Sequence, residues 1–146
     1  MKIPMRIKAR KDYIRFLKSL EVEQVFLSEC KASFDRARFV AKSSKQISLS
    51  GRTRFGDPDI SASGFSVSAA IEVLIGAEKT AEPIGKVQAT FFLKFSMMGE
   101  KPDHEHIIRF AKTNIKIIIW PFFREFVHNL TARFGIPHVT IPIHAG

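Results

Sequence analysis

Apolar and polar residues alternate over several segments of the chain, which is the pattern of a half-buried β-strand. The alternation is clearest in residues 65–75 and 87–97, and a shorter strand is predicted over 47–55. The segments 65–75 and 87–97 are expected to pair as a hairpin with one apolar face. The apolar positions of the 87–97 strand share that face: Val87, Ala89, Phe91, Leu93, Phe95 and Met97.

A further strand is predicted over residues 22–34, because they are rich in β-branched and aromatic residues. Residues 56–64 have the sequence GDPDISASG, and Gly, Pro, Asp and Ser each favour turns, so a loop is expected there. The alternation in the 22–34 strand is looser than in the others. It places on one face Val22, Phe26, Cys30, Ala32 and Phe34.

Helical spacing of apolar residues, three or four apart, occurs near both ends of the chain. Residues 7–20 are predicted to form a short amphipathic helix with basic residues between its apolar positions. Residues 103–134 are predicted to form a long helical region. Proline fits the first turn of a helix, so Pro121 indicates that the regular part begins near 117–120 or is kinked there.

Strands followed by helices predict an α+β fold, with a four-stranded antiparallel sheet and a long helix packed on one side of it. The whole chain, residues 1–146, is expected to be a single domain. The segment after the long helix contains prolines and is expected to be extended. The parts of the domain are then a basic N-terminal helix within 1–20, the sheet within 22–97, the helical region 103–134 and the extended tail 136–143.

The composition is that of a globular protein, with 45% apolar and 25% charged residues. The only cysteine, Cys30, cannot close an intrachain disulfide, as is usual for proteins of the reducing cytosol. No uncharged apolar run approaches the length of about twenty residues that a membrane-spanning helix needs. We therefore expect a cytoplasmic protein that does not insert into membranes.

The chain carries 23 Lys and Arg residues against 14 Asp and Glu, a formal net charge of +9. Most of the excess lies up to Lys18, and this basic segment has two interpretations. It is either a solvated arm or an arm that contacts phosphates, which would make the protein a small basic nucleic-acid-binding module. Tyr13 and Phe16 are too few and too helical in spacing for a base-stacking surface, so nucleic acid is the less favoured partner.

Residues that could carry catalysis are few and scattered. His104 and His106 are two residues apart, which on a helix places them on different faces and lacks the spacing of a zinc-binding helix. No glycine-rich phosphate-binding loop occurs, and Cys30 lies within a predicted strand. The sequence therefore predicts no enzyme, no catalytic residue, no metal site and no cofactor.

Phenylalanine is unusually abundant, with 14 residues against one Tyr and one Trp. Core packing accounts for most of them. However, the adjacent pairs at 91–92 and 122–123 place aromatic rings on both faces of their elements. At least one ring of each pair must therefore meet another layer or a partner, which predicts oligomerisation or a groove for a client chain.

Residues 115–143, IKIIIWPFFREFVHNLTARFGIPHVTIPI, resemble the helix and following extended segment of SecB and SecB-like chaperones. The alternating segments upstream fall where the strands of that family fall, so the likeness extends over about residues 22–143. The leading helix and strand, 7–34, look more like the SecB-like chaperones of toxin–antitoxin modules. The positions that carry the motif are Trp120, Pro121, Phe122, Arg124, Glu125, Phe126, Leu130, Arg133, Ile136, Pro137, Val139 and Ile141.

The resemblance implies a homotetramer, a dimer of dimers, that holds unfolded polypeptides in apolar grooves without ATP. Such a holdase would serve protein export or stabilise an antitoxin. The export chaperone SecB docks its partner SecA through an acidic surface, and the net charge of +9 departs from this, so coupling to SecA stays open. The residues expected to line the groove are Ile47, Leu49, Phe65, Phe92, Trp120, Phe122 and Phe123.

Overall fold

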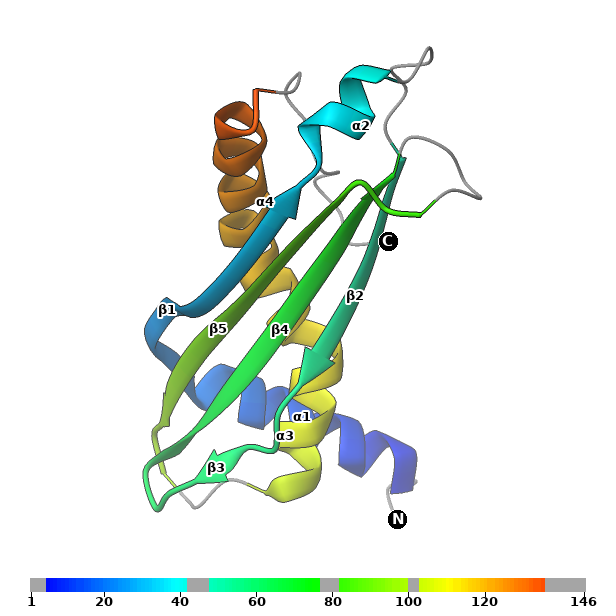
Figure 1. Cartoon of the computed structure of the whole chain (residues 1–146). Helices are drawn as coiled ribbons and strands as arrows, with labels where there is room; N and C mark the ends of the chain where they lie inside the picture. The colour runs from blue at the N-terminus through cyan, green and yellow to red at the C-terminus, as the bar shows by residue number, and fades with distance from the viewer. Residues whose placement is uncertain (1–4, 42–47, 77–81, 100–102, 136–146) are drawn as a thin grey trace.

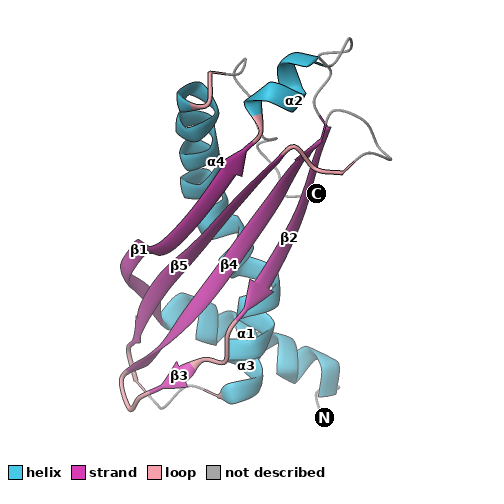
Figure 2. Ribbon diagram, viewed as in Figure 1, coloured by secondary structure: helices cyan, strands magenta, loops and turns pink. Residues whose placement is uncertain are grey.

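The computed structural model describes residues 5–41, 48–76, 82–99 and 103–135. They form an antiparallel sheet with helices packed on one of its faces (Figures 1 and 2). The elements in chain order are α1 (Met5–Ser19), β1 (Leu20–Phe34), α2 (Arg36–Ala41), β2 (Ser48–Phe55), β3 (Asp59–Ile60), β4 (Gly64–Gly76), β5 (Gly85–Met97), α3 (His104–Phe110), a π-helical turn (Ala111–Ile115) and α4 (Lys116–Arg133).

The strand order is β1–β5–β4–β2, and the short strand β3 pairs with β4 beyond the end of β2. The predicted antiparallel sheet with a long helix on one side is confirmed, and β3 lies within the segment that was expected to be only a loop. Among the strands that the structure describes, β1 and β2 lie at the edges, and only β4 and β5 have a neighbouring strand on both sides along most of their length.

β4 and β5 pair from Gly64 opposite Ser96 to Ile75 opposite Gly85, as the expected hairpin requires. Buried residues alternate with half-buried or exposed ones from Phe65 to Gly76 and from Gly85 to Ser96. The apolar face packs against the helices, whereas no helix of the described residues covers the other face, which is mostly polar. An ion pair between Lys86 and Glu72, with Nζ and Oε2 3.3 Å apart, lies on that outer face.

β1 pairs with β5 along its whole length, but the register shifts twice. Each shift is a β-bulge, in which one extra residue of β1 has no partner on β5. The extra residues are Glu23 and Ser28. Side chains of a strand alternate between its two faces, so each extra residue exchanges the faces of the residues that follow it. The second bulge exchanges the faces again and returns the strand to its initial alternation.

The phase is therefore reversed only between the two bulges. There, Val25 and Leu27 lie on the face that carries the helices, and Phe26 lies on the outer face opposite Phe92. The prediction that placed Phe26 on the same face as Val22 is wrong for this reason. The rings of Phe26 and Phe92 are in contact, with centroids 5.0 Å apart.

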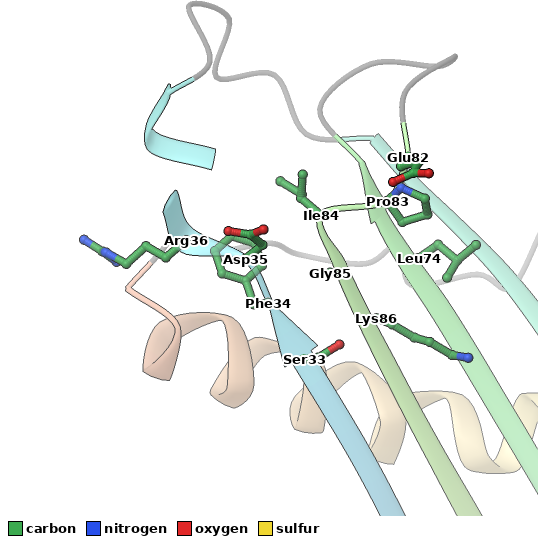
Figure 3. Close-up of a pocket in the computed structure, with 10 residues that line it drawn as sticks. All are labelled: Ser33, Phe34, Asp35, Arg36, Leu74, Glu82, Pro83, Ile84, Gly85 and Lys86. Carbon is green, nitrogen blue, oxygen red and sulfur yellow. The ribbon is translucent and has the colours of Figure 1, made fainter. Parts of the chain in front are cut away.

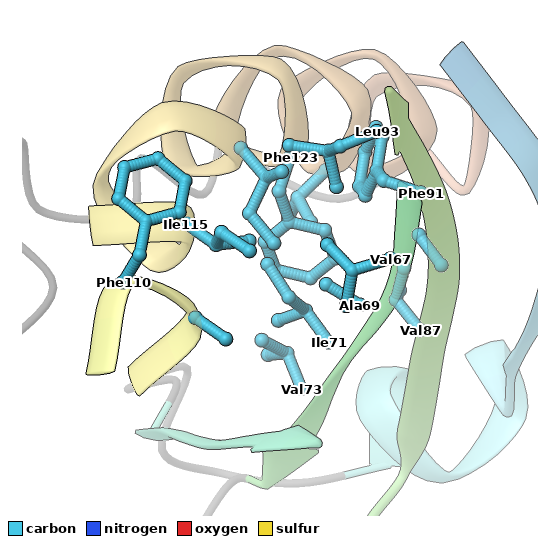
Figure 4. Close-up of a cluster of buried hydrophobic side chains, with 14 of the residues drawn as sticks. Val67, Ala69, Ile71, Val73, Val87, Phe91, Leu93, Phe110, Ile115 and Phe123 are labelled. Atoms are coloured by element: carbon cyan, nitrogen blue, oxygen red, sulfur yellow. The ribbon is translucent and has the colours of Figure 1, made fainter. Parts of the chain in front are cut away.

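α3, the π-helical turn and α4 follow one another without a break and cover the buried face of the sheet (Figure 4). One residue per turn points into the core, so the apolar spacing seen in the sequence is the packing face. These helical core residues are Ile107, Phe110, Ala111, Ile115, Ile119, Phe123 and Val127.

Pro121 lies inside α4, which begins at Lys116, so the helix starts just before the predicted range. A proline has no N–H group and cannot donate a hydrogen bond to the carbonyl one turn before it, here that of Ile117. The backbone departs from regular α-helix in the preceding segment, where the π-helical turn widens the helix between Ala111 and Ile115.

α1 packs across α3 at one end of the sheet (Figure 1). Tyr13 and Phe16 are buried, and the ring of Phe16 contacts those of Phe65 and Phe110. α2 is only six residues long and is not predicted from the sequence. It is stabilised at its start by Asp35, whose carboxylate accepts a hydrogen bond from the backbone N–H of Arg38. The expected extended tail, 136–143, lies outside the described residues.

Candidate functional site

Large apolar side chains are exposed on β1 and on the neighbouring part of α4. The exposed fractions are 53% for Val22, 48% for Phe26, 41% for Leu27 and 48% for Phe122. Contiguous exposed apolar surface in a soluble domain marks a place where a partner or ligand binds. These residues therefore locate the candidate site at the β1 edge of the molecule.

A groove of about 290 Å³ runs between β1 and α4. We call it the β1–α4 groove. Most of its lining side chains are apolar, and its polar side chains come from α4. The residues that line it are Val25, Phe26 and Leu27 of β1, Phe91 of β5, and Phe122, Glu125, Phe126 and Asn129 of α4.

The groove exists because α4 covers the middle of the sheet more completely than its edge. Phe123 and Val127 of α4 are fully buried against the sheet. Phe122 and Phe126 are four residues apart, so they share a neighbouring face of the helix, which turns toward β1. The rings of Phe122 and Phe91 lie with centroids 6.5 Å apart, which closes the floor of the groove.

The bulges in β1 decide which of its side chains enter the groove. With regular alternation from Val22, Phe26 would face α4, and Val25 and Leu27 would point away from it. The extra residues place Val25 and Leu27 toward α4 instead. Phe26 also borders the groove from the outer face, where its ring contacts that of Phe92 at an angle of 35° between the ring planes. The apolar surface therefore continues around the edge of the sheet.

The polar residues of the groove are Glu125 and Asn129. Within the described part of the chain, neither side chain makes a hydrogen bond or an ion pair. The Asn129 amide has both donors and an acceptor, and the Glu125 carboxylate accepts. An extended polypeptide in the groove would find partners there for its backbone N–H and C=O groups.

The residues predicted to line the groove are distributed over three places. Phe122 lines the groove, and Phe92 lies beside it on the outer face, against Phe26. Trp120 is half-buried, with its ring against Phe123 at 5.9 Å between centroids.

The other predicted residues lie away from the groove. Leu49 is half-buried on β2, at the opposite edge of the sheet. Phe65 and Phe123 are core residues, 2% and 0% exposed, and offer no surface to a partner in this structure. Ile47 lies outside the described residues.

Sequence reasoning missed the β1 side of the groove, Val25 and Leu27, together with Phe126 of α4. The signal for Phe126 was present, since it follows Phe122 by one helical turn. The sequence prediction does not include Val25 and Leu27, because it treats the loose alternation of 22–34 as one continuous phase. A reversal of phase in the middle of a strand is the sequence sign of a bulge.

A wider depression of about 790 Å³ lies where β1 runs into α2, beside residues 82–84 and the start of β5 (Figure 3). Three of its four charged residues already serve the fold. Asp35 caps α2, and Lys86 pairs with Glu72. The guanidinium of Arg36 donates through Nη1 to the carbonyls of Phe134 and Gly135, both at 2.9 Å, and so binds the end of α4. We assign this depression a structural role.

The described residues contain no cluster of three or more His, Cys, Asp or Glu side chains placed to hold a metal ion. None of the helices in this part of the chain combines the length and apolar character needed to cross a membrane.

Neither a protein-family model nor the sequence of a curated protein matches this chain. Its structure is similar to that of the SecB-like chaperone Rv1957 of Mycobacterium tuberculosis, solved in complex with a ChAD peptide from the Rv1956 HigA1 antitoxin. The TM-score is 0.75, with 19% sequence identity over 94% of this chain and 99% of that one.

A protein of unknown function from Streptococcus agalactiae also matches, with a TM-score of 0.42 and 11% identity over 84% of this chain and 96% of that one, which is too distant to bear on the fold. The similarity to Rv1957 agrees with the resemblance found in the sequence at residues 115–143. The chain therefore has the fold of a SecB-like chaperone.

Proposed function

We propose that this protein is an ATP-independent holdase chaperone, and that the β1–α4 groove binds apolar segments of unfolded polypeptides. The observation that carries the proposal is the group of exposed apolar side chains that meets in one groove, with Leu27 and Phe122 on its two walls. A groove of this kind selects for apolar character and extended shape rather than for one sequence. That is the specificity a holdase needs.

The size of the groove suits weak binding at each site. Apolar burial contributes about 25 cal/mol per Å², and most of that gain is offset when a flexible chain is ordered. Several equivalent grooves on one oligomer restore useful affinity for a long client. We therefore propose that the chain acts as a homotetramer, a dimer of dimers, in the cytoplasm.

The structural neighbour supports a peptide as the ligand, since Rv1957 was solved with a peptide from an antitoxin. We propose that the clients of this chain are unfolded polypeptides and that an antitoxin is among them. Unfolded proteins on their way to export are the other class of client that we consider for this fold. A panel of unrelated denatured proteins distinguishes the two roles, because a dedicated antitoxin chaperone protects one client and a general holdase protects many.

The test is suppression of aggregation of a chemically denatured client after dilution into the purified protein. We expect protection at about equimolar oligomer. The variant Phe122→Ala/Leu27→Ala removes one side chain from each wall of the groove. It is expected to need about thirtyfold more protein, since each side chain contributes on the order of 1 kcal/mol when partly buried and the two together about 2 kcal/mol.

The matched control is Ile117→Ala. Ile117 is also on α4 and is 67% exposed, but it does not line the groove. The Ile117→Ala variant should protect the denatured client as well as the unmodified protein does. Equal activity of the groove variant and the control would reject the groove as the binding site, and no protection by the unmodified protein would reject the holdase function.

A further inference from the structure

The outer face of α1 carries a stripe of cations that neither the fold nor the groove uses. Lys11, Arg15 and Lys18 follow one another at spacings of four and three residues, so they share one face of the helix. All three side chains are exposed, and none makes an ion pair within the described residues. We call them the α1 stripe.

Two further cations stand beside α1, on the helix that it crosses. The guanidinium of Arg109 lies over the ring of Tyr13, with its carbon 4.0 Å from the ring centroid. Lys112 follows Arg109 by three residues, and both border a shallow hollow of about 360 Å³ together with His104, Glu105, Ile108 and Thr113. Neither cation is in an ion pair within the part of the chain that the structure describes. Positive charge therefore extends from α1 onto α3 and the π-helical turn that follows it.

The burial of the apolar face of α1 argues against two polyanions as the partner of the α1 stripe. These are an anionic membrane and a single-stranded nucleic acid. The apolar face of α1 cannot enter a membrane, because Tyr13 and Phe16 are 7% and 5% exposed and packed on α3 and the sheet. The same burial removes the rings on which the bases of a single strand would stack. What remains is a convex ridge that binds through charge.

A convex helical ridge fits the major groove of duplex DNA. That groove is about 12 Å wide, close to the diameter of about 10–12 Å of an α-helix with its side chains, whereas the major groove of duplex RNA is deep and narrow. Lys11 and Lys18 are about 10 Å apart along the helix, by the rise of about 1.5 Å per residue, and so can reach several phosphates. α1 contains no Asn or Gln with which to read adenine.

We propose that the α1 stripe, with Arg109 and Lys112 beside it, binds the phosphate backbone of duplex DNA without sequence preference. DNA binding would be an activity in addition to the proposed chaperone function. The DNA surface lies on α1 and α3, whereas the client groove lies between β1 and α4. Different residues form the two surfaces. A client can therefore be held by a chaperone that is bound to DNA.

The test is fluorescence anisotropy of a labelled random-sequence duplex titrated with the full-length protein. With about four to six phosphate contacts, raising NaCl from about 50 to 200 mM should weaken binding by about 10²- to 10³-fold. The variant Lys11→Gln/Arg15→Gln should weaken binding at least about tenfold and reduce the slope of log affinity against log salt by about two.

The matched control is Arg52→Gln/Arg54→Gln, which removes the same charge from exposed positions of β2. It should change the affinity less than about threefold, since these arginines are on an edge strand far in sequence from α1 and in a different layer. Equal weakening by both variants would overturn the proposal, because binding would then follow net charge alone. Equal thermal unfolding of both variants verifies that the fold is retained.

The choice of duplex DNA is tested by competition. Single-stranded DNA, duplex RNA, a polyglutamate peptide and anionic vesicles should each compete less well than duplex DNA at equal charge concentration. Tighter binding of any of these overturns the assignment, as does the absence of duplex binding at about 50 mM salt. Phe122→Ala/Leu27→Ala should bind DNA normally, and Lys11→Gln/Arg15→Gln should still protect clients, so failure of one proposal is distinguishable from failure of the other.

Discussion

β5 and β1 are hydrogen-bonded to each other along their whole length, yet they serve different purposes. β5 is central, with β4 on its other side, and from Gly85 to Ser96 its buried residues alternate with less buried ones. β1 lies at an edge of the described sheet and has two bulges, and most of its residues are exposed. Close packing on one face holds the central strand to a regular pattern. The edge strand is free of that restraint, and its irregularities shape the groove.

The largest difference between the two strands should appear in stability. Leu93 on β5 is fully buried, and Leu93→Ala is expected to lower the free energy of unfolding by about 2–5 kcal/mol, through lost apolar transfer and the cavity that remains. Leu27 on β1 is 41% exposed, and Leu27→Ala should cost about 1 kcal/mol or less. Urea denaturation of both variants measures the contrast. Similar losses would show that β1 belongs to the core.

Deletion of Ser28 tests the bulge directly. Without Ser28, Leu27 and Glu29 would be consecutive in the chain. Their partners Phe91 and Thr90 are also consecutive, so the pairing would continue without a bulge and each side chain would keep its face. The local bend and twist that the bulge gives to β1 would be lost, which would move Leu27 relative to α4. We expect weaker client protection, with a change in stability of about 1 kcal/mol. Unchanged protection would contradict a role of the bulge in shaping the groove. Insertion of one residue after Asp57, outside the strands, is the control for a change in chain length.

The bulges also define what the sequence could and could not predict. The strands β4 and β5 were recognised because both have one face sealed against the helices, which enforces period-two alternation. The helical stripe of α4 was recognised for the same reason. Phe26 was placed on the wrong face, because nothing in local propensity locates an extra residue in a strand. Phe65 was offered as a groove residue, since a sequence cannot tell a ring in the core from one at the rim.

A smaller effect is expected where the end of β1 is joined to the end of α4. Arg36 donates to two carbonyls at the C-terminal end of the helix, which both satisfies these acceptors and complements the helix dipole. The contact is exposed, so Arg36→Ala should cost about 1 kcal/mol. Hydrogen exchange should quicken in the last turn of α4 and leave β5 unchanged. Faster exchange across the whole sheet would contradict this local role.

The smallest effect should come from the surface charges of β1. Glu29 and Lys31 form an ion pair of 3.5 Å, with side chains 64% and 75% exposed. Water screens such pairs, so Glu29→Gln is expected to change stability by less than about 0.5 kcal/mol. Its thermal midpoint should match that of the unmodified protein at low and high salt. A clear, salt-dependent loss would show that charge, rather than packing, holds the edge strand.

The central claim is that a client lies in the β1–α4 groove, and photo-crosslinking tests it most directly. A photoreactive phenylalanine analogue is placed at Phe126, in the groove, and in a second protein at Phe55, on the opposite edge strand. The two sites are compared with a denatured client under the same illumination. We predict strong crosslinks from position 126 and few from position 55. Equal crosslinking from both positions, or crosslinks from position 55 alone, would contradict the account.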